Sequence, residues 1–498
     1  MTEKRGIVST ESVRSNTSPK KYHHNPMKHL LASLLLLVPF GAPASAKENP
    51  ASKPNFIIIF TDDQGYADLG CFGSKTIRTP NIDRMAREGR KFTSFYVACS
   101  ICTPSRAALV TASYPKRVGL QKGVLFPGSN YGLNPAEYTI GDHFKSLGYA
   151  TACIGKWHLG HHKETLPTNN GFDSYFGIPY SNDMTYPDNK KRPHPSMSDY
   201  GWTHQDEFTK AYNTPLMEND KIIEVPADQR TITRRYTDKA IEFVKAHKDK
   251  PFFLYLAHSM PHIPLFVPKD AYDPDPNNAY KCVIEHIDSQ VGRLLQTVRD
   301  LGLAENTWVV FTSDNGPWAR FGKFAGSAKP LRGSKGTTFE GGQREPCVMW
   351  APGRIPAGTT SDAFLCTMDL LPTFANLANS KLPENLRIDG YDASATVTGD
   401  APSPRTEMLY YSPRGALEGI RQGDWKLLVK KPWRRNPKAK KLPRTQILLF
   451  NLAKDISEKN NLAAKHPEKV NALRKRMAEL DAEITAHARP VWRKKSSK

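Results

Sequence analysis

Four short apolar runs stand out in the pattern of hydrophobic and polar positions, at residues 56–60, 150–154, 252–256 and 308–311. Each run is bounded by turn signals and rich in β-branched, aromatic or other apolar residues, which is typical of a strand buried on both faces of a sheet. If the four strands are adjacent and parallel, their carboxyl ends lie at one edge of the sheet. Because open α/β sheets bind ligands at that edge, the pattern predicts a functional site there.

Residues that bind metals or move protons come soon after each of these runs. The candidate residues are Asp62, Asp63, Lys156, His158, His258, His262, Asp314 and Asn315. The carboxylate and amide oxygens among them suit a hard divalent cation, either Ca²⁺ or Mg²⁺. An isolated Asp-Asp pair is more often a turn or a cap than a pair of ligands. The prediction of a metal site therefore depends on two such pairs converging at neighbouring strand ends.

The spacing of the basic candidates makes further predictions about their orientation. Lys156 and His158 lie two positions apart, so on an extended segment both side chains point to one side and Trp157 points to the other. His262 stands between two prolines, which restrict the backbone and favour a positioned side chain. We interpret His258, four residues earlier, as a structural residue or a neighbour of the site.

The arrangement of these segments predicts an α/β protein with a large catalytic domain. Residues 47–405 are expected to contain a large mixed, mostly parallel sheet with helices on both faces. Residues 183–235 are rich in Pro, Asp and Tyr. We expect this long insertion to border the substrate entrance.

Residues 406–498 predict a smaller C-terminal domain that combines an antiparallel sheet with a terminal helix. Strands are expected at 407–411 and 425–429, and an amphipathic helix at 467–488. The apolar face of this helix would comprise Val470, Leu473, Met477 and Leu480.

The N-terminal residues are typical of a secretory signal peptide. An apolar stretch at 30–40 follows Lys28 and precedes Ala44-Ser45-Ala46, and it is too short for a comfortable membrane span. We therefore expect residues 1–46 to be a signal region, with Met27 as an alternative start. The protein is then secreted or periplasmic, and the lack of Asn-x-Ser/Thr sequons after this region favours a bacterial origin.

Composition adds less than the pattern does. The formal net charge of +21 predicts attraction to polyanions, which include nucleic acid, anionic membranes and acidic polysaccharides. No nucleic-acid motif occurs, so we expect anionic substrates, no nucleic-acid partner and no stable membrane span, although a generally basic surface explains the charge equally well. Seven cysteines in 498 residues are too few for a disulfide framework.

The segment from Cys99 to Ala112 allows three interpretations. The pair Cys99 and Cys102 has redox or zinc spacing, but no second pair completes a zinc site. A structural interpretation has Thr103 capping a helix with Pro104 in its first turn. A catalytic interpretation places Cys102 at the helix N-terminus, where the dipole favours anions, with Arg106 adding a cation one turn along.

The run Cys102-Thr103-Pro104-Ser105-Arg106 resembles the signature of the formylglycine-dependent sulfatases, which belong to the alkaline phosphatase superfamily. Further similar blocks follow in family order, and they favour the branch of arylsulfatase A and N-acetylgalactosamine-6-sulfatase. These blocks are residues 61–65, 79–83, 155–160, 313–316, 333–342, 449–452 and 461–463. Ala112 stands where Gly is commoner in the family, which is a sterically mild departure.

The resemblance implies hydrolysis of sulfate monoesters, with a sulfated carbohydrate as the expected substrate. In this family the cysteine is oxidised to formylglycine, so Cys102 would require a maturation enzyme as a partner. Its hydrated aldehyde would be the nucleophile, and a sulfated hemiacetal would be the intermediate. The implied cofactor is Ca²⁺, with Mg²⁺ as the alternative, and the implied ligands are Asp62, Asp63, Cys102, Asp314 and Asn315.

The resemblance also implies roles for the remaining site residues. Lys156 would bind a sulfate oxygen or steady the hydrated aldehyde. Lys335 would contact the sulfate and help neutralise the leaving group, and His262 would contact the ester near its leaving oxygen. His158 would take a proton from the second hydroxyl of the hydrated aldehyde. Ser181 would be a further polar contact to the sulfate.

Two other functions stay open at this point. One is hydrolysis of phosphonate or phosphate esters, which the same superfamily also performs, and the other is non-catalytic binding of sulfated glycans. The basic run at 430–444 is either a solvated hairpin tip or a subsite for a sulfated polymer. The pattern does not determine the sulfate position, exo or endo action, or the oligomeric state.

Overall fold

A computed structural model describes residues 53–185, 199–430 and 445–495. The described residues belong to one unit, which spans Ser52–Lys498. The predicted signal region and residues 431–444 of the basic run lie outside the described residues, as do residues 186–198 of the insertion. The seven cysteines, all in the described part of the chain, are free thiols.

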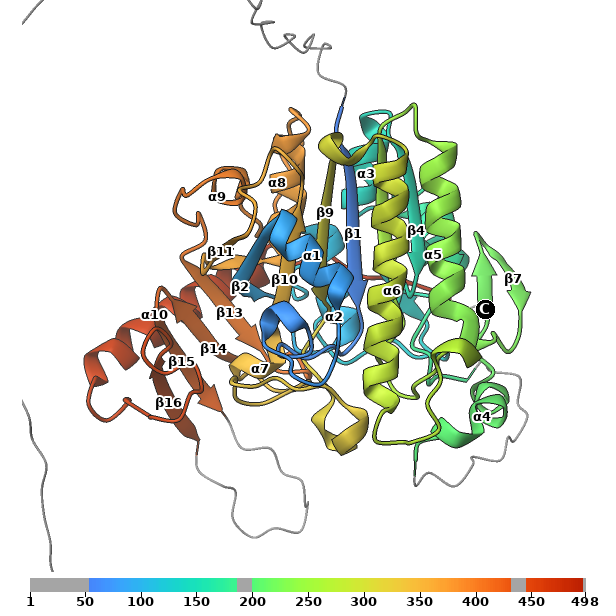
Figure 1. The fold of residues 1–498 in the computed structure, drawn as a ribbon. Helices are drawn as coiled ribbons and strands as arrows, with labels where there is room; N and C mark the ends of the chain where they lie inside the picture. The colour runs from blue at the N-terminus through green and yellow to red at the C-terminus, as the bar shows by residue number, and fades with distance from the viewer. Residues whose placement is uncertain (1–52, 186–198, 431–444, 496–498) are drawn as a thin grey trace, which may run out of the picture. The chain divides into compact units, whose positions relative to one another are not determined.

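The four apolar runs form adjacent parallel strands at the centre of the main sheet (Figure 1). They are β1 (Asn55–Thr61), β4 (Ala150–Gly155), β8 (Phe252–Ala257) and β9 (Thr307–Ser313), in the spatial order β9-β1-β8-β4. Parallel pairing is continuous, since β1 pairs with both β8 and β9, and β4 pairs with β8. The predicted convergence of these four strand ends at one edge is therefore confirmed.

Further strands extend this sheet on both sides, and eleven strands take part. They are β2 (Arg90–Tyr96), β5 (Ser174–Gly177), β6 (Leu216–Glu218), β7 (Lys221–Glu224), β10 (Arg344–Trp350), β11 (Thr359–Ser361) and β12 (Leu365–Cys366). β10 is antiparallel to both β2 and β9, and β6 is antiparallel to β5 and β7, so the sheet is mixed but mostly parallel, as predicted. The strands β6 and β7 lie within the 183–235 insertion, which therefore contributes to the sheet edge.

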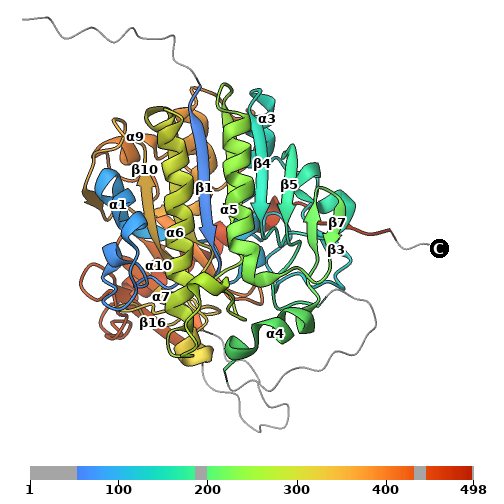
Figure 2. The same cartoon turned by 45° about the vertical axis from the view of Figure 1, so that its right-hand side comes forward.

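Helices cover both faces of the sheet because its central strands are apolar on both sides (Figure 2). In β1, Ile57 and Ile59 pack into the core beneath α1 (Pro80–Glu88), α5 (Gln229–Ala246) and α6 (Ala279–Asp300). The alternate residues Phe56, Ile58 and Phe60 pack into the opposite core. The helices of that core are α2 (Cys102–Thr111), α3 (Ile140–Ser146), α8 (Leu370–Leu377) and α9 (Ser394–Thr398). Two further helices are α4 (Gln205–Tyr212) and α7 (Glu340–Gln343).

The C-terminal residues form a four-stranded antiparallel sheet with a terminal helix. Its strands are β13 (Glu407–Tyr411), β14 (Leu417–Gln422), β15 (Trp425–Lys430) and β16 (Gln446–Asn451), and the helix is α10 (Pro467–Ala486). Val470, Leu473 and Met477 of α10 are buried as predicted, Leu480 is half-buried, and Ile484 extends the apolar face. A separate two-stranded ribbon pairs β3 (Tyr131–Gly132) with β17 (Trp492–Arg493). The proposed boundary between residues 405 and 406 stays a prediction.

Buried charges join the C-terminal sheet to the main sheet. Lys426 of β15 is fully buried, and its Nζ lies 2.7 Å from Glu340 Oε1 and 2.9 Å from Glu458 Oε1. Burial by itself raises the pKa of the Glu340 carboxyl, but Lys426, Arg344 and Arg421 outweigh burial and lower that pKa to about 2. Glu340 is therefore ionised and depends on these cations for compensation.

We predict that replacing Lys426 with methionine lowers the free energy of unfolding by about 3–5 kcal/mol, because two buried carboxylates lose their shared cation. The matched control is Lys430→Met on the same strand, since Lys430 is partly exposed and lies 3.7 Å from Glu418. That long, partly exposed pair contributes about 1 kcal/mol or less. Urea unfolding followed by circular dichroism measures both values, and equal losses would contradict the prediction.

Several buried histidines predict acid sensitivity of the fold. Burial lowers the pKa of His143 and His286 to about 4, and burial together with nearby His286 lowers that of His258 to about 3. These side chains are neutral in the folded protein but become protonated below about pH 6.5 in the unfolded chain. Stability therefore falls as the pH drops below about 6.5, because the unfolded state binds more protons.

His258 offers the cleanest test of this effect, because its ring is fully buried and neither nitrogen has a hydrogen-bond partner among the described residues. We expect the wild-type melting temperature to fall between about pH 7.5 and about pH 5. The His258→Phe variant should show a shallower fall, since one buried titrating ring is gone. An identical pH dependence in both proteins would contradict the assignment.

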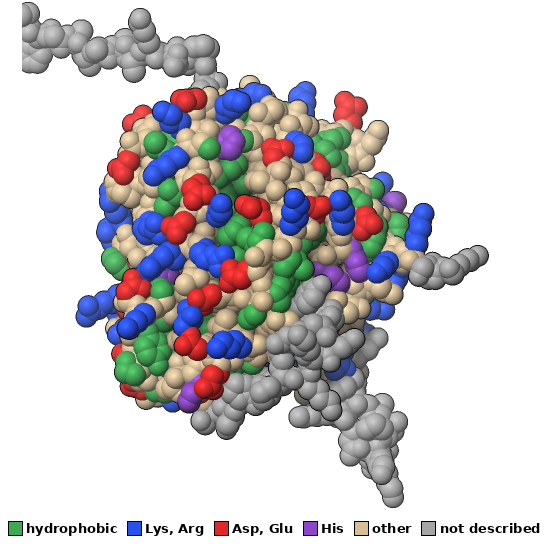
Figure 3. All heavy atoms as spheres, turned by 90° about the vertical axis from the view of Figure 1, so that its right-hand side faces the viewer, with side chains coloured by type: hydrophobic (Ala, Val, Ile, Leu, Met, Phe, Trp, Pro, Cys, Tyr) green, Lys and Arg blue, Asp and Glu red, His purple; other side chains and the backbone are tan. Residues whose placement is uncertain are grey.

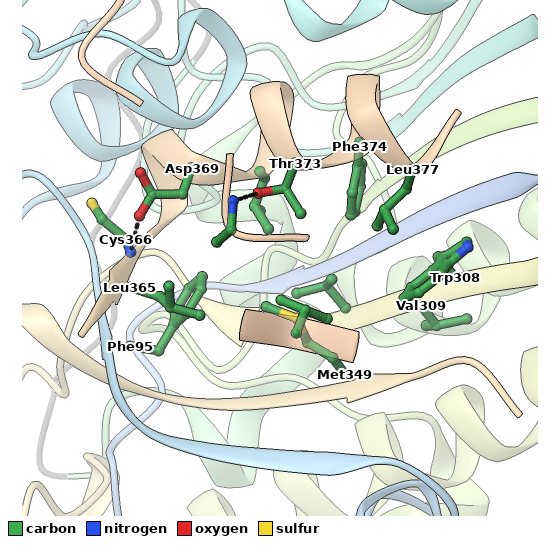
Figure 4. A pocket seen from close by; sticks show the side chains of 14 residues that line it. Phe95, Trp308, Val309, Met349, Leu365, Cys366, Asp369, Thr373, Phe374 and Leu377 are labelled. Carbon is green, nitrogen blue, oxygen red and sulfur yellow. Dashed lines mark hydrogen bonds between the residues drawn. The ribbon is translucent and has the colours of Figure 1, made fainter. Parts of the chain in front are cut away.

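A small apolar cavity lies between β9, β10 and α8 (Figure 4). Its volume is about 10 Å³, close to the minimum that holds one water molecule. At its rim Asp369 accepts a hydrogen bond from the Cys366 backbone, and Thr373 accepts one from the Ala393 backbone. The cavity contains none of the predicted site residues, so it is a packing gap and not a substrate pocket.

On the face drawn in Figure 3, Lys and Arg side chains are interspersed with Asp and Glu. The positive charge is therefore not concentrated in one patch on that face. Among the described residues, the structure contains no helix of the length and apolar character needed to cross a membrane.

Candidate active site

Cys102 lies at the first position of α2, at the carboxyl edge of the main sheet. Its Sγ is 3.5 Å from Asp62 Oδ1 and 3.5 Å from Lys335 Nζ, and the side chain is buried. The prediction that Thr103 caps this helix is wrong, because Ile101 occupies the N-cap position and no side chain caps it. Thr103 instead donates to the His158 carbonyl and accepts from the Leu125 backbone, which links the helix start to two loops of the site.

The acidic residues meet because β1 and β9 are neighbours. Asp62 and Asp63 follow β1, and Asp314 and Asn315 follow β9. Asn315 Nδ2 donates to Asp63 Oδ1 at 2.7 Å, and the Asp63 backbone N–H donates to Asp314 Oδ1 at 3.2 Å. Asp63 has a φ of 66°, a left-handed conformation that is uncommon outside glycine and often occurs at functional sites.

Three cations from separate segments neutralise these carboxylates. Lys156 forms an ion pair with Asp62 and donates to Ser181 Oγ at 3.1 Å. Lys335 Nζ lies 2.6 Å from Asp63 Oδ1 and 2.8 Å from Asp63 Oδ2. The third cation, the fully buried Arg106, donates through Nε and Nη2 to one oxygen of Asp314 at 3.0 and 2.8 Å.

This charge arrangement separates the pKa values of two neighbouring acids. Burial raises the pKa of Asp62, but Lys156 and the other nearby cations outweigh burial and hold it well below its usual range. Burial and the negative Asp62 raise the pKa of Asp314 to about 7. Burial also raises the pKa of the Cys102 thiol, despite Lys156 and Lys335. The unmodified thiol is therefore neutral and a poor nucleophile at neutral pH.

His262 lies beside Ser181 and Asp63 at the same edge. Its Nε2 is 3.3 Å from Ser181 Oγ and 3.7 Å from Asp63 Oδ2, and its Nδ1 is 2.6 Å from the Ile263 carbonyl. A carbonyl only accepts hydrogen bonds, so Nδ1 carries the proton and Nε2 faces the site as an acceptor in the neutral ring. Burial and Lys335 lower the pKa of His262, which favours this neutral form.

His158 reaches the site by a different geometry from the predicted one. Its φ of 60° turns the chain after β4, so the prediction of a simple extended Lys-Trp-His segment is wrong. Trp157 packs into the core as expected. His158 Nε2 lies 2.9 Å from the Leu125 carbonyl, and Nδ1 is buried with no hydrogen-bond partner in the described part of the chain. Burial and Lys156 lower the pKa of His158 well below its usual value.

The side chains present fit a divalent cation. One potential ligand atom from each of Asp62, Asp63, Cys102 and His262 lies within 4.8 Å of the others, and all four residues are buried. Asn315 Oδ1 is also buried and has no hydrogen-bond partner among the described residues. An unsatisfied amide oxygen beside several carboxylates suits a hard, oxygen-preferring ion.

All eleven predicted site residues therefore gather at one edge of the sheet, and their roles stay predictions. Sequence reasoning missed Trp318, whose ring centroid is 5.3 Å from that of His262 and 4.4 Å from Lys335 Nζ. Its position three residues after Asn315, beyond a Gly-Pro turn, is a signal that could have identified it. His258 takes no part in these contacts.

Comparison with known proteins agrees with this geometry. The sulfatase family model matches residues 54–380. Human arylsulfatase A is 36% identical over 461 residues, which cover 87% of this chain and 90% of that protein. N-acetylgalactosamine-6-sulfatase of Canis lupus familiaris is 35% identical over 404 residues, with coverage of 79% and 74%. The solved structure of Ps i-CgsB in complex with k-i-k-neocarrahexaose is 31% identical with a TM-score of 0.73, covering 90% of this chain and 96% of that one.

A mixed α/β sheet with acids, cations and imidazoles gathered around one cysteine defines an enzyme that acts on an anionic ester. The match over residues 54–380 and the relatives above show that the chain belongs to the sulfatase family. It is a sulfatase, and its reaction is the hydrolysis of sulfate esters.

Proposed function

We propose that this sulfatase removes sulfate from a sulfated carbohydrate, with formylglycine formed from Cys102 as the nucleophile and Ca²⁺ as the metal. The observation that carries this proposal is the enclosure of Cys102 by buried donors and cations. Lys335 lies 3.5 Å from Cys102 Sγ, Lys156 donates to Ser181, and Ser181 adjoins His262. Such a pocket stabilises a tetrahedral anion with groups that need no reorganisation during reaction.

The raised thiol pKa supports conversion of Cys102 to another group. A cysteine nucleophile normally has a lowered pKa, whereas burial and the neighbouring Asp62 and Asp314 favour the neutral thiol here. Formylglycine would supply a hydrated aldehyde with two hydroxyl groups in place of that thiol. Production of this group requires a maturation enzyme as a partner.

The metal would be held by the oxygens of Asp62, Asp63, Asp314 and Asn315 together with the modified residue 102. A bound divalent cation would supply electrostatic stabilisation of charge on the ester oxygens. Ca²⁺ is proposed before Mg²⁺ because the resemblance to the family implies it, while oxygen ligands by themselves suit either ion.

The chain's own residues then bind the sulfate and move protons. Lys156, Lys335 and Ser181 contact the sulfate oxygens and oppose the charge that develops on them. The departing oxygen takes a proton from the Lys335 ammonium group, which therefore acts as the general acid, and His262 lies beside it with an unprotonated Nε2. His158 Nδ1, which is buried and without a partner among the described residues, accepts the proton of the second hydroxyl at residue 102.

A carbohydrate substrate is supported by two of the relatives. One is named N-acetylgalactosamine-6-sulfatase, and the other was solved in complex with k-i-k-neocarrahexaose. The net charge of +21 also favours an anionic polymer over a neutral substrate. We further propose that the enzyme acts outside the cytoplasm after removal of residues 1–46.

The rival function is hydrolysis of phosphate or phosphonate esters. Parallel assays of matched aryl sulfate, aryl phosphate and sulfated sugar esters separate the two, with protein from a host that matures the cysteine. We expect turnover of sulfate esters and formylglycine in the tryptic peptide 92–106 by mass spectrometry. Faster turnover of the phosphate ester would overturn the proposal, and binding of sulfated glycan without sulfate release would favour a non-catalytic role.

A further inference from the structure

Trp318 contacts both of the residues proposed to act at the leaving oxygen, His262 and Lys335. Its ring centroid is 5.3 Å from the His262 ring, and Lys335 Nζ lies 4.4 Å from the same centroid. A backbone hydrogen bond also joins the two segments, because the Lys335 backbone N–H donates to the Pro317 carbonyl at 3.0 Å. The indole therefore belongs to the same side-chain cluster as His262 and Lys335.

Trp318 differs from its neighbours in exposure and polarity. Asp63, Ser181 and His262 are each at most 3% exposed, whereas Trp318 is partly exposed. Among the described side chains that form a hydrogen bond, an ion pair or a ring contact with the side chain of His262 or Lys335, Trp318 is the one that is both apolar and partly exposed. A sulfate ester that places its sulfate among the buried polar groups must direct its organic part toward solvent, and Trp318 is a partly exposed side chain that contacts those groups.

We propose that Trp318 forms the wall that binds the ring of the alcohol carrying the sulfate. The inference rests on the proposed function and names the part of the substrate that this residue recognises, a pyranose ring with an apolar face. Aromatic side chains bury large apolar areas and present a rigid face at low entropic cost. Trp318 is thus a specificity-determining residue for the organic part of the ester and not for the sulfate.

Neighbouring rings hold the indole in place. Phe321 packs edge-on against Trp318 at 4.7 Å, and Tyr200 packs edge-on against Phe321 at 4.8 Å. Arg320 lies 5.6 Å from the Trp318 ring centroid. A wall that is ordered before binding loses less conformational freedom when the sugar arrives, which favours affinity.

A different role for Trp318 would be to position Lys335 through the cation–π contact. The two roles predict different results for inorganic sulfate, which fills the buried pocket but has no ring. If the indole binds the sugar ring, its loss weakens binding of the sulfate ester and leaves binding of inorganic sulfate unchanged. If the indole positions Lys335, loss of the indole weakens binding of both the ester and inorganic sulfate, and it lowers kcat.

The experiment compares wild-type enzyme with Trp318→Ala and Trp318→Phe on a sulfated monosaccharide, with inorganic sulfate as a competitive inhibitor. We expect Trp318→Ala to raise KM for the sugar by about 10-fold or more, with kcat and the inhibition constant of sulfate within about 3-fold of wild type. The KM of Trp318→Phe should lie between the values of the wild type and Trp318→Ala. This variant keeps an aromatic ring, so it tests the proposal even if the alanine variant misfolds. Tyr391→Ala is the matched control, because Tyr391 is an exposed aromatic residue outside the site with 44% exposure.

Three outcomes would overturn the proposal. An unchanged KM for the sugar in both Trp318 variants means that the indole does not bind the ring. A parallel rise in KM and in the inhibition constant of sulfate, with a lower kcat, assigns Trp318 to the positioning of Lys335. If the wild-type enzyme releases no sulfate from any ester, the proposed function fails first and the Trp318 proposal fails with it.

Discussion

The Cys102→Ala enzyme should lose essentially all turnover of sulfate esters, with kcat lowered by at least about 10,000-fold. Cys102 is a potential nucleophile that lies 3.5 Å from both an acid and a cation of the site, Asp62 and Lys335. Its loss leaves the pocket able to bind sulfate but with no group to attack sulfur. The measurement is kcat on an aryl sulfate, together with the inhibition constant of inorganic sulfate, which should change little.

Two further variants make this prediction sharper. Cys99→Ala is the matched control, since Cys99 is buried in the same segment but takes no part in the site, and it should retain wild-type kcat. Cys102→Ser carries a single hydroxyl and has no second one with which to expel sulfate. It should therefore accumulate a stable sulfate ester at residue 102, visible as added SO₃ in the intact mass. Retention of a tenth or more of wild-type activity by Cys102→Ala would contradict the assignment of the nucleophile.

Removal of the divalent cation is expected to have the second largest effect, a loss of about 100- to 10,000-fold in kcat/KM. Asp62, Asp63 and Asp314 are buried together, and Asn315 Oδ1 has no hydrogen-bond partner among the described residues. A divalent cation would satisfy the Asn315 oxygen and add to the compensation that Lys156, Lys335 and Arg106 give these carboxylates. Activity should therefore disappear after chelation and return with added Ca²⁺ more fully than with Mg²⁺.

The melting temperature provides a readout of metal binding that does not depend on activity. A ligand that binds the folded state alone stabilises it, so Ca²⁺ should raise the melting temperature of the chelated protein. Asp63→Asn should weaken this rise, because it removes one ligand charge while keeping the size of the side chain. The control Asp173→Asn alters a half-exposed acid away from the site and should leave the rise unchanged. Full activity after exhaustive chelation would contradict the metal assignment.

Much of the fold was predictable because its signals are local. The run 56–60 is apolar at every position, and such a run is stable only as a strand covered on both faces. The structure confirms this, with alternate residues of β1 in opposite cores. The C-terminal strands β14 and β16 were not predicted, because Leu417–Gln422 carries polar side chains and the segment of β16 adjoins a basic run.

Where sequence reasoning failed, long-range packing outweighed a local preference. Thr103 has a residue type that favours the N-cap position, yet its hydroxyl bonds the His158 carbonyl, 55 residues away. His158 was placed on an extended segment, but its backbone adopts the left-handed conformation after β4. Neither outcome follows from nearest neighbours in the chain.

By itself the sequence determined the four central strands, a helix in the segment that contains Cys102 and the residue types that gather beyond the strand ends, because hydrophobic periodicity and helix propensity are local properties. Only the tertiary structure decided which of these charged groups meet. Lys335 contacts Asp63 across 272 residues and Arg106 contacts Asp314 across 208 residues, and both pairs depend on the order of the strands in the sheet. Trp318 likewise belongs to the site because the tertiary structure places its ring against His262 and Lys335. Contacts of this range form only once the core has packed, since the packing of the sheet and helices sets the distances between loops.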